Sequence, residues 1–379
     1  MNQISKKNHK CSILLPSLGG GGAEKVFAGL YNYLIEEKYN VSLILLDLKG
    51  ANLLKIKNKL NLVNLKTKRV SKSIPKIIFF LLKNKPKVVL SAMSHTNIAL
   101  IISCLIYKII SKNEIRIIVS ERAPTNFLFP YEKSIYNKLI RFLIKFFYNY
   151  AEKIISVSDG VKRDLIKDFR IEKEKIFTIM NPVDLSDKTL TKKLTKPFLW
   201  FKDSVPIGIS IGRLSKEKGF DTLLKAIKEV NKFIEYRHII CGVGKEKENL
   251  IKNLIQLNLE DKVHFADYVE DTNIWIRNSN VFVCTSRWEG CPNVILEALA
   301  CNIPVISTNC PYGPSELLQK GKWGRLVDVD SVNQISRAII EVIKFPLNKD
   351  LKLKTYLKEN FSKETIYKKY ESIIFNGII

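Results

Sequence analysis

The sequence predicts an α/β protein with two αβ domains, each a parallel sheet flanked by helices. Three observations lead to this prediction. Short β-branched apolar runs alternate with amphipathic segments through both halves of the 379 residues, as parallel strands joined by helical crossovers do. Loops that contain glycine follow several of these runs. A polar, non-periodic run rich in threonine and lysine, residues 186–196, separates the two series and indicates a linker.

Length and composition fit a globular chain of two ordinary domains, with 46% apolar residues. No run approaches the ~18 uncharged apolar residues of a membrane-spanning helix, since the longest candidate, Ile98 to Ile110, contains Lys108. Cys11 to Leu18 runs into four glycines and is expected to be a core strand, not a signal peptide. Seven cysteines without a Cys-x-x-Cys pair predict reduced thiols in a cytoplasmic protein, with neither a disulfide framework nor a zinc site.

Positive charge is concentrated in the first part of the chain. Residues 1–150 hold 25 Lys/Arg and 7 Asp/Glu, while residues 51–100 hold eleven basic side chains and no acidic one. A coding bias toward lysine raises lysine everywhere, but it does not explain an acid-free segment. Such an asymmetry indicates an anionic partner, either nucleic acid or a membrane surface.

The first predicted strand, Cys11 to Leu15, leads through Gly19–Gly22 into a helix over Ala23 to Glu37. Consecutive glycines let a backbone approach a phosphate, so Gly20, Gly21 and Gly22 are candidates for an anion loop. Two alternatives stay open. One is a dinucleotide fingerprint with Asp47 on a ribose, although Glu24 replaces its third glycine. The other is a plain tight turn.

Two further strand ends carry polar side chains. Val88 to Ser91 is a predicted strand, and His95 lies where it hands over to an apolar helix, as either a site residue or a structural histidine. Ile115 to Ser120 is the next strand, and the pair Glu121-Arg122 follows it. That pair is interpreted either as a simple edge cap or as part of a cleft.

Tyr131 to Tyr150 has the clearest amphipathic pattern of the chain. Its apolar residues recur at helical spacing, and Lys138, Arg141 and Lys145 share another face; the apolar set is Ile135, Leu139, Phe142, Leu143, Phe146, Phe147 and Tyr150. One interpretation is a core helix with a solvated basic side. The other is a membrane-surface helix with aromatic residues at the interface and lysines on anionic lipid.

Lys153 to Val157 is another predicted strand of the first half, before the linker. The second series opens with the strand Ile207–Ile211, the loop Gly212–Gly219 and the helix Phe220–Val230. Arg213 and Lys218 in that loop are suited to bind a diphosphate without a metal ion. The alternative is an ordinary basic loop with no ligand.

The strand Val281 to Thr285 leads into a loop with Gly290, then a helix over Val294 to Cys301 with Pro292 near its start, then the strand Ile303 to Ser307. Free N–H groups and the helix dipole favour an anion in such a loop. Glu289 in this loop and Glu297 in the following helix are candidate site carboxylates. Alternatively, Glu289 is only a solvated helix cap and Glu297 a buried structural glutamate. Asp328-x-Asp330 stands before a helix and predicts an N-cap, so no metal site is assigned.

The whole chain resembles glycosyltransferase family 4. The string Glu289-Gly-Cys-Pro-Asn-Val-Ile-Leu-Glu297-Ala-Leu-Ala-Cys looks like the signature of these retaining enzymes. Further matching pieces are Gly19–Glu24, Ile155–Val161, Asn181–Asp184, Gly212–Gly219 and Gly242–Gly244. Val119–Arg122 with Cys310–Glu316 looks like the branch that extends lipid-linked glycans for bacterial surface polysaccharides.

The resemblance implies the GT-B arrangement of two facing Rossmann-like domains. We therefore expect domains at 1–185 and 205–362, a linker at 186–204, and a last helix, 363–379, that crosses back to the first domain. The implied partners are a nucleotide-sugar donor, a lipid-linked glycan acceptor and an anionic membrane surface, with no nucleic acid and no metal cofactor. We expect a cytoplasmic protein associated peripherally with the inner face of the cell membrane.

The resemblance also implies roles for single residues. Arg213 and Lys218 would bind the donor diphosphate, Glu297 the ribose hydroxyls, and Glu289 with the backbone of Gly290–Asn293 the sugar. The residues implied in catalysis are His95, Glu289, Arg213 and Lys218. Those expected to bind the donor are Gly20, Gly21, Gly22, Arg213, Lys218, Glu289, Gly290, Cys291, Pro292, Asn293, Val294 and Glu297.

The function that follows is transfer of a hexose or N-acetylhexosamine from a UDP-sugar to an undecaprenyl-diphosphate-type glycan, with retained configuration. The family often has a histidine at the strand end where this chain has Glu121-Arg122, and His95 matches the acceptor-side histidine loosely. Two other functions stay open, a GT-B sugar-nucleotide 2-epimerase and a non-catalytic, membrane-bound polysaccharide-assembly subunit.

Overall fold

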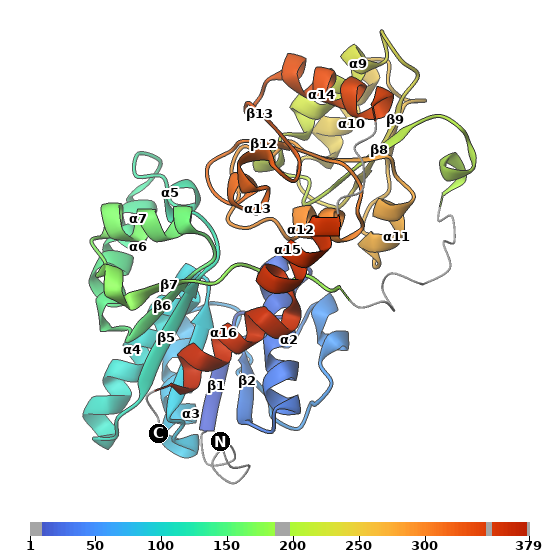
Figure 1. Ribbon diagram of the computed structural model, residues 1–379. Coiled ribbons are helices and arrows are strands. Elements are labelled where there is room, and N and C mark those ends of the chain that lie inside the picture. The colour runs from blue at the N-terminus through green and yellow to red at the C-terminus, as the bar shows by residue number, and fades with distance from the viewer. Residues whose placement is uncertain (1–9, 186–197, 346–350, 377–379) are drawn as a thin grey trace. The chain divides into compact units, whose positions relative to one another are not determined.

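The computed structural model describes residues 10–185, 198–345 and 351–376, which form the two αβ units drawn in Figure 1. One unit lies within Met1–Pro182 and Glu364–Ile379, and the other within Val183–Lys363. Most of the expected linker, residues 186–204, falls outside the described residues. Its end forms a short 3-10 helix, η5, over Leu199–Lys202.

The first unit contains a seven-stranded sheet in the order β3-β2-β1-β4-β5-β6-β7. All neighbouring strands run parallel. Strands of such sheets are covered on both faces, so they are continuous apolar runs and not alternating ones. They are β1 (Lys10–Leu15), β2 (Asn40–Leu45), β3 (Leu62–Asn64), β4 (Val88–Ala92), β5 (Arg116–Glu121), β6 (Lys153–Ser156) and β7 (Ile176–Thr178).

The chain reverses its direction of travel across this sheet between β1 and β4. From β1 it moves outward to β2 and β3, and from β4 it moves the other way through β5, β6 and β7. Ligands of open α/β sheets bind at this kind of reversal, outside the carboxyl ends of the two strands. The loops that follow β1 and β4 therefore occupy the favoured ligand position of the first unit.

Helices α2 (Gly22–Glu36) and α16 (Lys363–Phe375) share one hydrophobic core with strands β1, β2 and β4. The ring of Phe375 stacks on that of Tyr39 at 3.9 Å between centroids. The carboxylate of Glu371 accepts hydrogen bonds from the hydroxyls of Tyr33 at 2.7 Å and Tyr39 at 2.6 Å. The last helix of the chain thus completes one face of the first unit.

Helices α3 (Ile74–Asn84), α4 (Ser94–Ser111), α6 (Ile135–Phe147) and α7 (Asp159–Phe169) pack side by side in that order. Within the described residues, α4 alone is long and apolar enough to cross a membrane by length and composition, and 56% of it is buried. Its Asn97 donates to the carbonyl of Ser120 at 2.9 Å and accepts from Ser91 Oγ at 2.7 Å. These contacts are those of a core helix.

The second unit contains a six-stranded parallel sheet in the order β10-β9-β8-β11-β12-β13. Its chain reverses between β8 and β11, so the favoured ligand position lies outside the ends of those two strands. The strands are β8 (Ile207–Ile211), β9 (Arg237–Cys241), β10 (Val263–Phe265), β11 (Val281–Cys284), β12 (Val305–Thr308) and β13 (Arg325–Val327).

Helices α9 (Phe220–Val230) and α14 (Val332–Lys344) pack against each other, and with α10 (Lys247–Gln256) they contribute to the core of the second unit. The second unit also includes α11 (Thr272–Arg277), α12 (Asn293–Ala300), α13 (Pro314–Leu317) and α15 (Leu351–Phe361). Helix α12 is the next helix after β11. Its amino end therefore lies near the switch point of the sheet.

Candidate functional site

The switch point of the second unit brings together the two loops that the sequence singled out. The loop Gly212–Gly219 follows β8, the loop 285–292 follows β11, and these strands are hydrogen-bonded neighbours with Val281 opposite Gly208. Parallel strands end at the same edge of a sheet, so both loops leave that edge together.

Two glycines allow close backbone contacts around these loops. Gly219 has φ +65, and a Cβ there would lie 2.1 Å from the carbonyl oxygen of Thr285. Gly242, after β9, has φ +148, and a Cβ there would lie 1.8 Å from the carbonyl oxygen of Gly212. Neither position tolerates a larger residue without moving the backbone. Thr285 Oγ1 also donates to the carbonyl of Lys218 at 3.0 Å.

Lys218 and Glu289 form an ion pair between the two loops, with 2.5 Å from Nζ to Oε1. Ser286 Oγ donates to the same carboxylate oxygen at 2.6 Å. The side chains are 21% and 11% exposed. Burial has the largest single effect and lowers the pKa of Lys218, but the charge and hydrogen bond of Glu289, with the charges of Cys284 and Glu217, together raise that pKa above its ordinary value. Lys218 is therefore a cation held in place by Glu289.

Arg213 belongs to the same loop but has a different environment. Its side chain is exposed, and no residue in the described ranges pairs with it. A guanidinium presents a planar set of donors that matches phosphate oxygens. The loop thus combines one cation held in place by a carboxylate with a second one open to an anionic ligand.

Helix α12 supplies the third positive feature of this site. Pro292 is its N-cap residue, and Gly290, Cys291 and Pro292 are buried, while Asn293 and Val294 in its first turn are half-buried. Its first N–H groups and dipole favour a negative charge. Glu297, one turn further, is 8% exposed and accepts from Thr272 Oγ1 at 3.0 Å. The structure thus places both glutamates on one strand-loop-helix unit.

Arg287 was missed by sequence reasoning and organises the loop after β11. Its guanidinium lies 2.7 Å from Asp221 Oδ2 and 2.8 Å from Asp330 Oδ1, and it donates to the carbonyl of Lys216 at 2.5 Å. The expected N-cap at Asp328-x-Asp330 was wrong, because Ser331 caps α14. Asp330 is instead an anchor for Arg287. An arginine within a strand-to-helix loop is the only signal the sequence carries for this role.

The glycine loop lies at the switch point of the first unit, after β1. Gly21 is the N-cap of α2, which begins at Gly22, and Gly20 precedes them. The Glu24 carboxylate folds back over this loop, with Oε2 2.4 Å from where a Cβ on Gly21 would be. A carboxylate is favourable at a helix amino end. A phosphate bound by Gly20, Gly21 and Gly22 would have to displace it.

His95 lies in the first turn of α4, at the same switch point. Its Nε2 is 2.6 Å from the hydroxyl of Tyr136, and its ring packs edge-on against Phe129 at 5.2 Å. Burial lowers the pKa of His95 below its ordinary value. The imidazole is therefore neutral at pH 7, with its orientation fixed by a tyrosine of α6.

Glu121 and Arg122 are both buried inside the first unit, so the edge-cap interpretation was wrong. Glu121 accepts from Tyr148 at 2.7 Å and from Ser94 at 3.1 Å. Burial raises its pKa to about 7 despite these hydrogen bonds. Arg122 donates to the hydroxyl of Tyr370 at 2.9 Å and also to Asn181. Arg122 thus holds α16 on the first unit.

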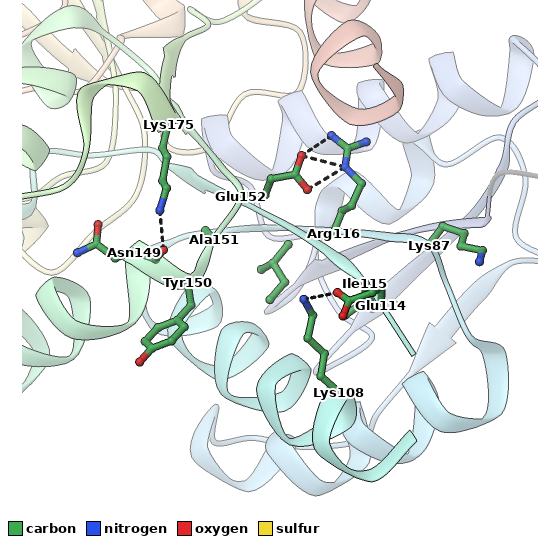
Figure 2. Close-up of a pocket in the computed structure, with 11 residues that line it drawn as sticks. Lys87, Lys108, Glu114, Ile115, Arg116, Asn149, Tyr150, Ala151, Glu152 and Lys175 are labelled. Atoms are coloured by element: carbon green, nitrogen blue, oxygen red, sulfur yellow. Dashed lines mark hydrogen bonds and ion pairs between the residues drawn. The ribbon is translucent and has the colours of Figure 1, made fainter. Parts of the chain in front are cut away.

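A cavity of the first unit lies at the opposite edge of its sheet. Figure 2 shows it among the amino-terminal ends of the strands. Its volume is about 510 Å³, and its lining includes Lys87, Lys108, Arg116, Tyr150 and Glu152. The described part of the chain contains no group of three or more His, Cys, Asp or Glu side chains arranged so that it could hold a metal ion.

Both halves of the chain match known families of enzymes. Residues 20–187 match the family described as Glycosyltransferase Family 4, and residues 192–363 match Glycosyl transferases group 1. An uncharacterized glycosyltransferase of Methanocaldococcus jannaschii is 32% identical over 301 residues, which cover 76% of this chain and 72% of the relative.

A second relative comes from Campylobacter jejuni and is 27% identical over 349 residues, covering 87% of this chain and 89% of its own length. It is named N-acetylgalactosamine-N,N'-diacetylbacillosaminyl-diphospho-undecaprenol 4-alpha-N-acetylgalactosaminyltransferase. Among solved structures, Anabaena HepE in complex with UDP-glucose superposes with a TM-score of 0.79 at 18% identity, over 96% of this chain and 98% of that one. The fold is that of GT-B proteins, as predicted.

Proposed function

Because the chain belongs to glycosyltransferase family 4, we propose that it transfers a hexose or N-acetylhexosamine from a UDP-sugar to a lipid-linked glycan acceptor, with retention of configuration. The acceptor class is a glycan on undecaprenyl diphosphate, used for bacterial surface polysaccharide. The single observation that carries the proposal is the Lys218–Glu289 ion pair, with Arg213 and the amino end of α12 at the same switch point.

The charges of this site suit departure of a nucleoside diphosphate. The bond from the sugar C1 to the β-phosphate oxygen breaks, and its electron pair stays on the phosphate. A hydroxyl oxygen of the acceptor forms the new bond to C1 and gives its proton to an oxygen of the departing diphosphate. Lys218, Arg213 and the N–H groups at the amino end of α12 stabilise the growing negative charge on the phosphate. No metal ion is needed for this role.

The two glutamates have separate tasks in the proposal. Glu289 holds Lys218 in place and accepts hydrogen bonds from hydroxyls of the sugar. Glu297 lies one turn into α12, beyond the N–H groups that would contact the diphosphate, and accepts from the ribose hydroxyls. Both are largely buried, and removal of water strengthens their hydrogen bonds to a bound ligand.

The lipid-linked acceptor is supported by the relative from Campylobacter jejuni, whose printed name describes a diphospho-undecaprenol acceptor. The UDP-sugar donor is supported by the likeness of the whole fold to HepE, which was solved with UDP-glucose. Such an acceptor is held in a membrane, so we place the enzyme on the cytoplasmic face of the cell membrane.

The test is release of UDP from a panel of UDP-sugars, with and without a lipid-linked acceptor and with a chelator present. We expect release that requires the acceptor and persists in the chelator. A 2-epimerase would change the donor sugar without any acceptor, and a non-catalytic subunit would leave the donor intact. A strict requirement for a divalent metal would contradict the site described above.

A further inference from the structure

Helix α6 buries one narrow apolar face and exposes a wider one. Ile140, Ile144 and Tyr148 point into the first unit and are 6%, 0% and 0% exposed. The opposite side carries a row of large apolar side chains at spacings of three and four residues, each 50% to 86% exposed. This stripe consists of Tyr131 just before α6, then Ile135, Leu139, Phe142 and Phe146 on the helix, and Tyr150 just after it. The core-helix interpretation therefore does not account for it.

The stripe is continuous and ordered. The rings of Phe142 and Phe146 stack with 6.1 Å between centroids, and those of Phe146 and Tyr150 are 5.9 Å apart. Exposed apolar residues scattered singly are normal, but a contiguous apolar patch of this kind marks an interaction surface. The water-exposed aromatic row costs free energy that a partner would recover.

The charges beside the stripe identify the partner. Lys138 and Lys145 are exposed on one flank, and Lys138 Nζ lies 5.0 Å from the ring centroid of Tyr131. Arg141 instead turns inward, over the ring of Phe169 at 4.7 Å, so the expected basic face is narrower than predicted. Lysines flanking an aromatic and aliphatic stripe fit a helix that lies in the plane of an anionic bilayer.

The far end of the stripe extends this positive surface. Tyr150 lines the cavity of Figure 2 together with Lys87, Lys108, Arg116 and Lys175. Arg116 is paired with Glu152, Lys108 with Glu114, and Lys175 with Glu172. Lys87 has no ion pair within the described ranges. Three of the four cations that line the cavity are thus paired, and the charge of Lys87 is left to make the end of the stripe positive.

We propose that the stripe of α6 is a membrane-docking face, which seats its aromatic and aliphatic side chains at the headgroup boundary of an anionic bilayer. Lys138 and Lys145 lie over the lipid phosphates, and the cavity behind Tyr150 adds positive charge at the same surface. The sources of attraction are both apolar and electrostatic, so neither alone supports full binding.

Docking in this orientation also predicts where the lipid-linked acceptor meets the first unit. This prediction rests on the proposed function. Helix α6 has 13 residues, a length of about 20 Å. Its first turn holds Tyr136, the partner of His95, and Tyr150, just past its last turn, lines the cavity at the opposite edge of the sheet. A bilayer along the stripe therefore places the His95 end of the first unit at the surface where a lipid-linked glycan emerges.

The direct test is depth-sensitive fluorescence. All four tryptophans of the chain, Trp200, Trp275, Trp288 and Trp323, lie in the second unit. Phe142→Trp adds one on the stripe, and Phe233→Trp adds a matched one at an exposed site of the second unit. With brominated phosphatidylglycerol vesicles, the Phe142→Trp protein should show extra quenching, and the Phe233→Trp protein should not. Equal quenching of both would overturn the proposal.

A second experiment separates the two contributions by flotation with phosphatidylglycerol/phosphatidylcholine vesicles. Phe142→Ser/Phe146→Ser and Lys138→Glu/Lys145→Glu should each lower partition by about tenfold. The controls Phe233→Ser/Ile255→Ser and Lys228→Glu change exposed residues of the second unit and should bind as the unaltered protein does. Binding by the first two variants at the unaltered level would refute the docking face.

A second copy of the chain is the competing occupant of the stripe. Sedimentation without lipid should show a monomer for both the unaltered protein and Phe142→Ser/Phe146→Ser. A dimer that the double variant abolishes, together with no vesicle binding, would assign the stripe to self-association instead. Docking on vesicles does not require sugar transfer. A Lys218→Ala protein that floats with vesicles normally but transfers no sugar would therefore support the docking face independently of the transfer activity.

Discussion

Lys218 Nζ lies 2.5 Å from Glu289 Oε1, and this ion pair ties the loop after β8 to the loop after β11 across 71 residues of sequence. Each partner depends on the other. Without Glu289 the ammonium would lose its anchor, and without Lys218 a largely buried carboxylate would lose its counter-charge. The pair therefore links the stability of the second unit to the chemistry of its site.

Lys218→Ala should lower the transfer rate by roughly 10²–10³, because it removes a fixed positive charge from the leaving phosphate. It should also lower the melting temperature, since Glu289 loses its partner. Lys218→Ala/Glu289→Gln should regain stability but not activity. Lys216→Ala, an exposed neighbour in the same loop, is the control. Transfer by Lys218→Ala at the rate of that control would show the assignment to be wrong.

Arg213→Ala should weaken binding of UDP by about tenfold or more without changing the melting temperature. The guanidinium is exposed and unpaired within the described ranges, so its removal leaves no buried charge behind. Calorimetric titration with UDP measures the first effect and a thermal melt the second. Lys228→Ala on α9 serves as a matched surface change. Unaltered UDP affinity would exclude Arg213 from the donor site.

Glu297→Gln should weaken UDP binding by roughly tenfold, because an amide has one acceptor oxygen where a carboxylate has two. The amide oxygen still accepts from Thr272, so the fold should survive. The specific readout is the ratio of affinities for UDP and 2′-deoxy-UDP. That ratio should shrink in the variant if Glu297 binds the ribose. A ratio equal to that of the unaltered protein would mean that Glu297 has a structural role.

His95→Ala should lower the transfer rate by about 10² and leave UDP affinity unchanged, because His95 belongs to the first unit and is proposed to act on the acceptor side. Tyr136→Phe removes the hydrogen bond of 2.6 Å to His95 and should give an intermediate loss. Single-turnover transfer and UDP titration measure the two effects. Loss of UDP binding in His95→Ala would contradict the acceptor-side role.

The buried carboxyl of Glu121 predicts that stability depends on pH. Burial raises its pKa from 4.5 to about 7 in the folded state, so the folded chain binds more protons than the unfolded one between these values. The contribution of Glu121 is complete below about pH 4.5 and is lost as pH rises through about 7, by an amount of the order of 3 kcal/mol.

Glu121→Gln isolates this effect, because glutamine fills the same space and does not titrate. The melting temperature of the unaltered protein should fall relative to that of the variant between pH 5 and pH 8. His95 titrates in both proteins, so the difference between them reports Glu121 alone. Parallel melting temperatures across this range would show that Glu121 is ionised in the folded chain throughout.

The sequence by itself determined the architecture and the place of the site. Apolar strand runs alternating with helical segments specify parallel sheets, because strands covered on both faces must be apolar throughout. Arg213 and Lys218 share the loop after one such strand, Glu289 lies in the loop after another, and His95 begins the helix after a third. Their meeting at the switch points follows from strand order, which local sequence does not encode.

Tertiary structure alone decided which charges are paired and which faces are buried. Arg287 finds Asp221 and Asp330 from different elements, and Glu121 and Arg122 end in the core because Tyr148 and the C-terminal helix close over them. Helix α6 has two apolar faces, and the helical periodicity of the sequence does not distinguish the buried face from the exposed one. Only packing against α4 and α7 selects Ile140 and Ile144 for burial and leaves Phe142 and Phe146 in solvent, because burial depends on neighbours that are distant in sequence.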